Sequence, residues 1–411
     1  SPGVMLLMFL FFPRLGPLWS LPNSSKGLTG LSDSMTPGDV AELSRSSALA
    51  FRVSFEGDMP PQSQLYWRAL TLEAFDGRRW SQSSAARLPM SPSWQKVGSP
   101  ISYSIVMQPS GQSWLFALDT AESSLSGVRQ MSDFRLENNR PVFQNLLYQV
   151  QSWPAAIRQL DLPADVAQRT LQLPEEGDPR SRSWARQLRQ ENADPQSLVS
   201  AMLRHFADEP YGYTLKPPPV GRNSIDDFLF RTRKGFCAHY AGAMVFVLRA
   251  AGIPSRVVAG YQGGELNQDG SYLSVRQLDA HAWVEYWVEG RGWISVDPTF
   301  QVAPERIELG ADEAFADDDG FLEDSPFSPL HYRDLAWLNE LRFGWDNLNY
   351  NWQRWVLGYK SEQQLQLLQR WFGTLEWSRL ALALVGGGGF LLGLLALWLF
   401  KPWQRERDPQ Q

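Results

Sequence analysis

A run of 21 residues without a charged side chain, LALALVGGGGFLLGLLALWLF, occupies positions 380–400. As a helix it would extend about 30 Å, which matches the hydrocarbon core of a bilayer. Arg379 precedes the run, whereas Lys401 and two arginines follow it. The sequence therefore predicts a transmembrane helix over 379–401, and the positive charge after the helix predicts a cytoplasmic tail at 402–411.

A second apolar segment, at the N-terminus, is too short to cross a membrane. Residues 4–12 are nine consecutive apolar residues, whereas a transmembrane helix needs about 20. The chain also starts with Ser1 rather than methionine. We expect residues 1–19 to be the end of a truncated transmembrane helix, and the large central region to lie outside the cytoplasm.

Composition argues against several classes of function. The chain of 411 residues has a net charge of -6 and no basic run, so we do not expect nucleic acid as a partner. Its single cysteine, Cys237, allows neither an intramolecular disulfide nor a CxxC metal site. The four histidines lack metal-ligand spacing. The acidic DDDG at 317–320 suggests a calcium loop of the EF-hand type, with Gly320 at its sixth position. That alignment puts Phe315 first and Pro326 twelfth, where carboxylates are needed. We therefore expect no metal.

Short alternating runs separated by turns fill the first part of the chain. The runs ALAFRVSF, QLYWRALTLEAF, SYSIVMQ and PVFQNLLYQV are typical of strands. They predict an all-β domain, a sandwich or small barrel. Later runs such as PADVAQRTLQL and SWARQLRQE are typical of helices.

These patterns divide the chain into eight segments. They are the truncated helix at 1–19, a connector at 20–47, a β-rich domain at 48–153, a core segment with helical texture at 154–304, an acidic loop at 305–329, a helical juxtamembrane segment at 330–378, the transmembrane helix at 379–401 and the tail at 402–411.

Cys237 lies where a predicted helix starts. The stretch AHYAGAMVFVLRAAG follows it, and GIP at 252–254 ends the helix. Free N–H groups and the positive end of the helix dipole stabilise a thiolate in the first turn. Arg231, Arg233 and Lys234 are expected to add to this effect. Cys237 is therefore a candidate nucleophile, although a lone cysteine beside an apolar helix is also a common packing residue.

The stretch DAHAWVEYWVEGRGWISVDPTF, residues 279–300, predicts a hairpin. Alternation places His281 and Asp297 on the faces of their strands opposite the small apolar residues. The two side chains share one face of the hairpin only if the loop has an odd number of residues. The sequence therefore predicts a three-residue connection, or a bulge, and a His281–Asp297 pair.

Cysteine, histidine and aspartate can together carry out acyl transfer. The imidazole takes the thiol proton, the carboxylate orients the ring, and the histidine later protonates the leaving amine. Taken separately, His281 is also explained as an ordinary strand histidine and Asp297 as a turn residue. His239 is the rival base, but two residues on a helix are about 200° apart. We expect His239 to point away from the thiol and to have a structural hydrogen-bonding role.

Three blocks of the chain resemble the transglutaminase-like superfamily: GFCAHYAGAMVFVLRAAGIPSRVVAGY, DAHAWVEYW and GWISVDPT. The segment GLSDSMTPGDVAELSRSSALAFRV, the β-rich region and the predicted membrane helix extend the resemblance to the bacterial membrane-anchored TgpA-like family. The resemblance implies a papain-like α+β core, with Cys237 as nucleophile, His281 as base and Asp297 as orienting acid. It implies transfer of a glutamine acyl group to an amine, without a cofactor, on the periplasmic side of the inner membrane.

Papain-like enzymes also need an oxyanion donor, and no unmistakable motif for one is present. The candidates for this donor and for the walls of a substrate cleft are Tyr211, Tyr213, Arg233, Trp283 and Trp293. The expected partners are a glutamine-bearing protein or peptide, an amine acceptor and the lipid bilayer. Two alternatives stay open: a cysteine peptidase or amidase acting on cell-wall or envelope peptides, and a catalytically silent envelope scaffold.

Overall fold

The computed structural model describes residues 30–87, 91–267, 271–311, 347–354 and 357. Within these ranges, no helix is both long enough and apolar enough to cross a bilayer. The predictions for 1–19, 379–401 and 402–411 lie outside the described residues, as do most of those for 305–329 and 330–378.

A five-stranded antiparallel sheet, in the order β21-β20-β17-β3-β9, carries most of the site. β17 (Ser255–Gln262) pairs with β20 (Ala280–Val288) on one side and with β3 (Tyr66–Leu72) on the other. The outer strands are β21 (Gly292–Val296) and β9 (Ala117–Leu118). A strand from the predicted β-rich domain therefore lies inside the sheet of the predicted catalytic core.

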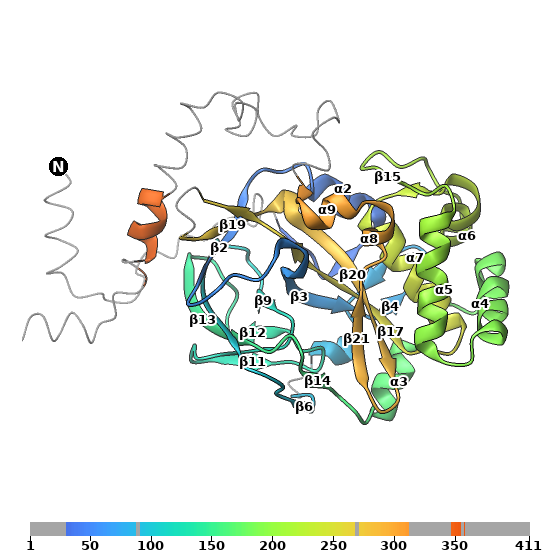
Figure 1. Cartoon of the computed structure of the whole chain (residues 1–411), viewed down its shortest axis with the longest axis horizontal. Helices are drawn as coiled ribbons and strands as arrows, with labels where there is room; N and C mark the ends of the chain where they lie inside the picture. The colour runs from blue at the N-terminus through green and yellow to red at the C-terminus, as the bar shows by residue number, and fades with distance from the viewer. Residues whose placement is uncertain (1–29, 88–90, 268–270, 312–346, 355–356, 358–411) are drawn as a thin grey trace, which may run out of the picture. The chain divides into compact units, whose positions relative to one another are not determined.

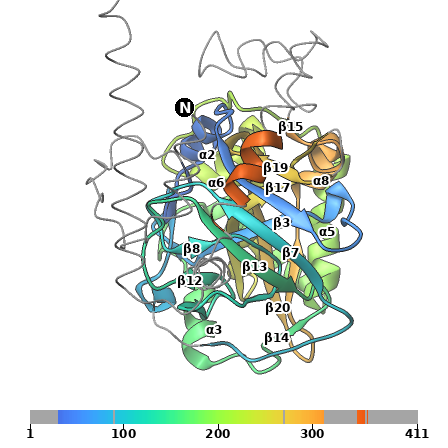
Figure 2. The same ribbon diagram turned by 90° about the vertical axis from the view of Figure 1, so that its left-hand side faces the viewer.

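A six-stranded sheet has the order β10-β13-β7-β2-β19-β18 (Figure 2). In this sheet, a strand from the predicted catalytic core pairs with a strand from the predicted β-rich domain. β19 (Leu273–Arg276) comes from the catalytic part of the chain and pairs with β2 (Leu49–Phe55). The other strands are β7 (Ile101–Met107), β10 (Ala121–Ser123), β13 (Leu146–Ser152) and β18 (Glu265–Leu266). The four strand runs expected from the sequence are confirmed in β2, β3, β7 and β13. Periodicity within a run does not specify the partner strand, so the sharing of sheets was not predicted.

Short strands complete the β structure. They are β1 (Ser34–Met35), β4 (Ala74–Phe75) and β5 (Trp80–Ser81) in one sheet; β8 (Trp114–Leu115), β11 (Val128–Gln130) and β12 (Leu136–Asn138) in another; β6 (Trp94–Gln95) with β14 (Ile157–Arg158); and β15 (Gly212–Tyr213) with β16 (Lys234–Gly235). The β15–β16 pair is parallel and sets Tyr213 opposite Gly235, two residues before Cys237.

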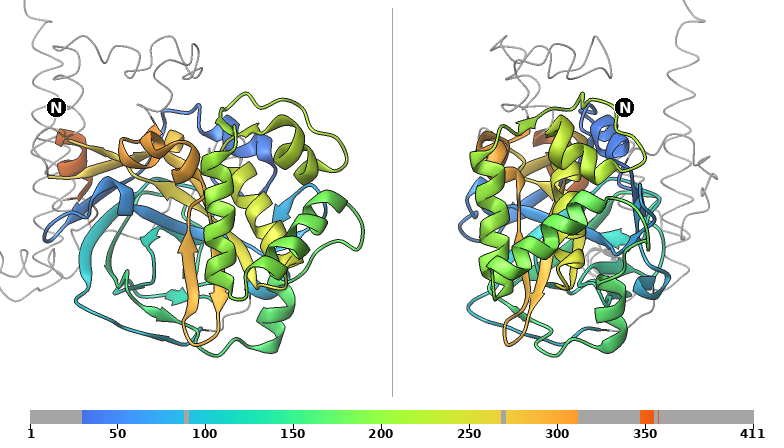
Figure 3. Two further views of the ribbon diagram at one scale, coloured as in Figure 1. Left: turned by 45° about the vertical axis from the view of Figure 1, so that its right-hand side comes forward. Right: turned by 90° about the vertical axis from the view of Figure 1, so that its right-hand side faces the viewer.

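The helices α4 (Pro179–Glu191), α5 (Pro195–Asp208), α6 (Ser224–Asp227) and α7 (Cys237–Ala250) gather on one side of the five-stranded sheet, away from the six-stranded sheet (Figures 1 and 3). The shorter helices α2 (Pro37–Leu43), α8 (Thr299–Val302) and α9 (Pro304–Glu308) lie along the top of the view in Figure 1, and α3 (Ala164–Thr170) lies at the bottom. α7 is apolar on all sides and packs against β20, β17 and α4, which is expected of a fully buried helix. The helix that starts at Cys237 is thus at the centre of the core.

One hydrophobic core joins the two predicted domains. The ring of Phe51 on β2 lies 5.4 Å from that of Trp67 on β3 and 5.7 Å from that of Tyr261 on β17. These residues belong to the same buried cluster as Cys237. The β-rich region therefore packs as part of the structure that supports the site.

Two helices occur where the sequence indicated irregular chain. α2 lies in the predicted connector, and Thr36 N–H donates to the Asp39 carboxylate at 2.7 Å to form a capping box. α9 lies at the start of the predicted acidic loop. Pro304 suits the first position of α9, and Glu305 suits its first turn.

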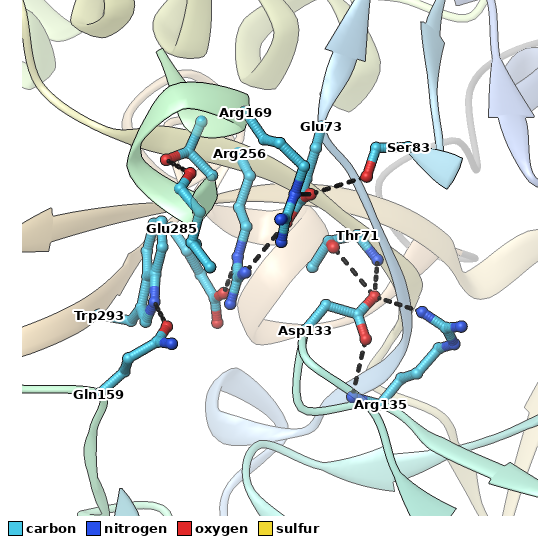
Figure 4. A network of polar contacts seen from close by, with 12 residues as sticks. Thr71, Glu73, Ser83, Asp133, Arg135, Gln159, Arg169, Arg256, Glu285 and Trp293 are labelled. Carbon is cyan, nitrogen blue, oxygen red and sulfur yellow. Dashed lines mark hydrogen bonds and ion pairs between the residues drawn. The ribbon is translucent and has the colours of Figure 1, made fainter. Parts of the chain in front are cut away.

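Charged side chains form a buried network on the five-stranded sheet (Figure 4). Glu285 on β20 accepts hydrogen bonds from Arg68, Arg158 and Arg256. Arg256 also pairs with Glu73 at 3.2 Å. The network connects β3, β14, β17 and β20, so it fastens the β-rich region to the strand that carries His281.

Candidate active site

Cys237 is the first residue of α7 and is 1% exposed. Its sulfur lies next to the free N–H groups of the first turn, where the helix dipole favours a negative charge. The backbone amide of Ala282 on β20 also helps to lower the pKa of the Cys237 thiol. The sequence prediction that Cys237 lies at a helix start is therefore confirmed.

The residue before Cys237 is held by His239. Phe236 N–H donates to His239 Nδ1 at 3.3 Å, and the rings of Phe228 and Phe236 pack against the imidazole. Burial lowers the pKa of His239 to about 4. The structural hydrogen-bonding role expected for His239 is confirmed, because a neutral imidazole engaged in this way is a poor general base.

His281 and Asp297 form a close pair. His281 Nε2 lies 2.7 Å from Asp297 Oδ2. In the register of β20 and β21, Val284 faces Val296 and Val288 faces Gly292, which leaves a three-residue connection at 289–291. Both the predicted pair and the predicted loop length are confirmed.

Two further groups hold the Asp297 carboxylate. Tyr66 O–H donates to Oδ2 at 2.7 Å, and the backbone N–H of Thr299 donates to Oδ1 at 3.0 Å. Because Oδ2 is also the oxygen that faces His281, the carboxylate has a fixed orientation. Nε2 of His281 is thereby engaged with Asp297, which leaves Nδ1 as the nitrogen able to exchange a proton with the thiol.

The pKa shifts of the three side chains are consistent with a thiolate–imidazolium pair. Burial alone would raise the pKa of Cys237, but the charge of the nearby His281, followed by the charge of Arg306, holds it below its ordinary value. Burial alone would lower the pKa of His281, but Asp297 and Cys237 raise it to about 9. Burial opposes ionisation of Asp297 as well, yet His281 and Tyr66 hold its pKa below the usual value. Each ionised group therefore stabilises its neighbour.

Tyr213 is the one oxyanion candidate that contacts the cysteine. Its hydroxyl accepts a hydrogen bond from Cys237 N–H at 3.3 Å. Burial, followed by the charge of Cys237, raises the pKa of Tyr213 well above its usual value. Tyr213 therefore keeps its proton and can act as a donor next to the sulfur.

Tyr211 and Arg233 have other partners. Tyr211 O–H donates to Leu229 O at 2.7 Å, and Arg233 pairs with Glu209 at 2.7 Å while its guanidinium lies over the Tyr211 ring. Arg231, also expected to stabilise the thiolate, pairs with Asp227 at 3.0 Å. Among the largest causes that lower the pKa of Cys237, the arginine is Arg306 rather than Arg231 or Arg233.

The two tryptophans proposed as cleft walls lie in different places. Trp283 packs edge-on against Tyr66, with ring centroids 5.2 Å apart, and borders a pocket of about 160 Å³ together with Tyr66 and Asp297. Trp293 instead lies under the guanidinium of Arg256 at 4.0 Å, and its Nε1 donates to Gln159 (Figure 4). Trp283 therefore adjoins the site, and Trp293 belongs to the charged network.

Two residues at the site were not identified from the sequence. Tyr66 appears there as one aromatic residue in a strand run, and Arg306 as one cation in an acidic stretch. Their approach depends on strand pairing and on a helix that follows the hairpin, and neither leaves a local pattern. The described residues contain no group of acidic, histidine or cysteine side chains suited to hold a metal ion.

Family models match most of the central chain. The TgpA N-terminal domain matches residues 3–159, and the transglutaminase-like superfamily matches residues 182–298. Cys237, His281 and Asp297 all lie within the second range. Tyr66 lies within the first range, and Arg306 lies beyond both.

Relatives and a solved structure agree with these matches. A Pseudomonas aeruginosa protein named protein-glutamine gamma-glutamyltransferase is 60% identical over 406 residues, which cover 98% of this chain and 61% of that protein. Bacillus subtilis YebA, described as uncharacterized, is 31% identical over 180 residues, covering 42% of this chain and 24% of YebA. The crystal structure of the periplasmic domain of TgpA from P. aeruginosa superposes with a TM-score of 0.67 at 60% identity, covering 69% of this chain and 99% of that domain. The chain thus spans about three fifths of the length of the P. aeruginosa protein and nearly all of its solved periplasmic domain.

Proposed function

Because this chain belongs to the TgpA family of transglutaminase-like proteins, we propose that it transfers the acyl group of a glutamine side chain to a primary amine. The reaction proceeds through a thioester on Cys237. One observation carries the proposal. Asp297 Oδ2 lies 2.7 Å from His281 Nε2, and His281 is close enough to Cys237 for its charge to lower the pKa of the thiol. The name of the P. aeruginosa relative supports the same type of reaction.

In the acylation step, the Cys237 thiolate attacks the carboxamide carbon of glutamine and a C–S bond forms. His281, protonated in the ion pair, gives its proton to the departing nitrogen. The C–N bond breaks and ammonia leaves. Asp297 stays ionised and keeps the imidazole in the orientation needed for this transfer.

In the deacylation step, the nitrogen of the acceptor amine attacks the thioester carbon. His281 takes a proton from that nitrogen, the C–S bond breaks, and the Cys237 thiolate is restored beside an imidazolium. The new bond is an amide, so the reaction exchanges ammonia for the acceptor amine.

Both tetrahedral intermediates carry a negative oxygen that needs donors. Cys237 N–H and the Tyr213 hydroxyl lie next to the sulfur, and the N–H donates to the hydroxyl oxygen at 3.3 Å. We assign the substrate carbonyl oxygen a position in which it accepts from both groups. The raised pKa of Tyr213 supports this role, since a protonated hydroxyl can donate.

Transfer competes with hydrolysis, because water and an amine attack the same thioester. The sulfur is buried, and Trp283, which adjoins Tyr66 and Asp297, is 3% exposed. This shielding favours an amine held by the protein over bulk water.

A direct test uses the full chain in detergent, a glutamine-bearing peptide and a fluorescent primary amine. Wild type should attach the amine to the peptide, whereas Cys237→Ala and His281→Ala should lose this activity. His205→Gln, which changes a histidine outside the site, should keep most of it. Ammonia release or peptide cleavage without amine attachment would instead identify a hydrolase. Absence of both would identify a binding protein.

We also propose that the described domain faces the periplasm and is held at the inner membrane by the helix predicted at 379–401. The solved relative is itself a periplasmic domain, and this chain covers 99% of it. A protease added to spheroplasts should cleave the described domain while the inner membrane is intact. Protection from the protease until the membrane is dissolved would contradict this placement.

A further inference from the structure

Arg306 is a buried cation whose described partners include no carboxylate. It lies on α9 and is 1% exposed. Nη1 donates to Gln262 Oε1 at 2.9 Å, and Nη2 donates to the backbone carbonyl of Asp279 at 3.2 Å. Within the described residues, Arg306 forms no ion pair with a carboxylate; its acceptors are amide and carbonyl oxygens. A charge left unpaired inside a protein is costly unless a nearby negative group offsets it.

The contacts of Arg306 lie at the ends of the strands that bear the site. Gln262 ends β17 and faces Tyr66 on β3. Ala280 starts β20, immediately before His281, and its carbonyl lies 3.5 Å from Arg306 Nη2. The guanidinium thus joins the end of β17, which pairs with Tyr66, to the start of β20, which supplies His281.

The charges of the three central side chains do not cancel. A thiolate on Cys237, an imidazolium on His281 and a carboxylate on Asp297 sum to one net negative charge, and all three side chains are largely buried. One additional positive charge makes the group neutral. Arg306 is close enough for its charge to lower the pKa values of Cys237, Tyr213 and Tyr66.

We propose that Arg306 is a positioning residue of the active site, which offsets the net negative charge of the ionised Cys237–His281–Asp297 group and fixes the strand end that carries His281. The inference rests on the proposed function, because it concerns the nucleophilic state of Cys237. It assigns to α9, which lies beyond the range matched by the superfamily, a part in activating the thiol.

The test measures the rate at which iodoacetamide alkylates the full chain in detergent, from pH 5 to pH 10. The chain has one cysteine, so the signal comes from Cys237 alone. Arg306→Gln and Arg306→Met remove the charge, whereas Arg306→Lys keeps the charge and loses the planar fork. Arg231→Gln is the control, because it removes an exposed cation close to Cys237 in sequence that pairs with Asp227.

At pH 7 the neutral variants should be alkylated about tenfold more slowly than wild type. The midpoint of the curve of alkylation rate against pH should lie at a higher pH in these variants than in wild type. Near pH 10, where the thiol is ionised in every variant, the rates should converge. Arg231→Gln should match wild type throughout. Arg306→Lys should keep the wild-type midpoint but lose kcat in amine transfer, because one ammonium group cannot bond both to Gln262 and to the carbonyls before His281, as the two guanidinium nitrogens do.

Two results would overturn the assignment. One is a neutral variant that keeps the wild-type midpoint, and the other is a lysine variant whose midpoint rises. The lysine variant decides the question even if both neutral variants fail to fold. If wild type itself titrates as an ordinary thiol, the proposed function fails instead, so the two failures are distinguishable.

Discussion

Tyr66 and Asp297 are joined by a hydrogen bond of 2.7 Å, made to the carboxylate oxygen that also faces His281. Tyr66 lies on β3, in the range matched by the TgpA N-terminal domain, whereas Asp297 lies in the range matched by the transglutaminase-like superfamily. A residue of the N-terminal region therefore orients the acidic member of the proposed triad.

Replacing Tyr66 by phenylalanine should lower the kcat of amine transfer by roughly tenfold, because a hydrogen bond to a charged group is worth about 1.5–3 kcal/mol. The control is Tyr148→Phe, which removes a buried hydroxyl that bonds to the Phe116 backbone. Steady-state kinetics of both variants check the prediction. Equal kcat values for Tyr66→Phe and wild type would show that Thr299 alone is enough to orient Asp297.

The activity should depend on pH in a bell-shaped manner. The pKa of Cys237 is lowered, so the active ion pair forms as pH rises through a value below the ordinary thiol pKa of about 8.5. The pKa of His281 is raised to about 9, so the pair loses the imidazolium proton as pH rises above that value. The kcat/KM profile should therefore have its plateau between these limits. A profile that keeps rising through pH 9 would indicate that the imidazolium form is not required.

Glu285 is expected to be a large contributor to stability. It is 0% exposed and accepts hydrogen bonds from Arg68, Arg158 and Arg256. Glu285→Gln keeps the shape but leaves three buried guanidinium groups short of a counter-charge, so the free energy of unfolding should fall by about 3–5 kcal/mol. Urea unfolding measures this change.

Glu122→Gln is the matched control for Glu285→Gln, because Glu122 pairs with Lys96 on the surface. Ion pairs on the surface contribute little to the free energy of unfolding. This variant should therefore unfold at nearly the same urea concentration as wild type. Equal losses in the two variants would mean that the buried network does not stabilise the fold.

Gly260 permits close contact between β17 and β3. A Cβ atom at this position would lie 1.9 Å from Trp67 O, at the register shift between these strands. Gly260→Ala should therefore lower the melting temperature strongly or prevent folding, and amine transfer should fall with the folded fraction. At Gly57 no atom lies within 4 Å of the added Cβ. Gly57→Ala should therefore have nearly the same melting temperature as wild type. Similar melting curves for the two variants would contradict the contact.

The part of the site that depends on local pattern could be predicted from the sequence. Composition and GIP at 252–254 predicted the helix after Cys237, and alternation with strand register predicted that His281 and Asp297 share a face. These inferences needed only periods of 3.6 and 2 residues and one loop length.

The remaining part of the site depends on contacts between distant segments. Tyr66 reaches Asp297 across 231 positions of sequence because β3 pairs with β17. Arg306 approaches Cys237 because α9 turns back toward the strand ends. The single-strand pattern around Tyr66 and the acidic composition around Arg306 do not specify either approach, so the sequence indicated a separate β domain and an acidic loop.

The proposed reaction requires that an acyl group form on Cys237. The decisive measurement is mass spectrometry of the full chain quenched in acid within the first turnover with a glutamine-bearing peptide, without an acceptor amine. We predict an adduct on the peptide fragment that contains Cys237, with a mass equal to the substrate less ammonia, that disappears on addition of a primary amine and is absent from Cys237→Ala. Amine transfer by Cys237→Ala, or an adduct on another residue, would contradict the account.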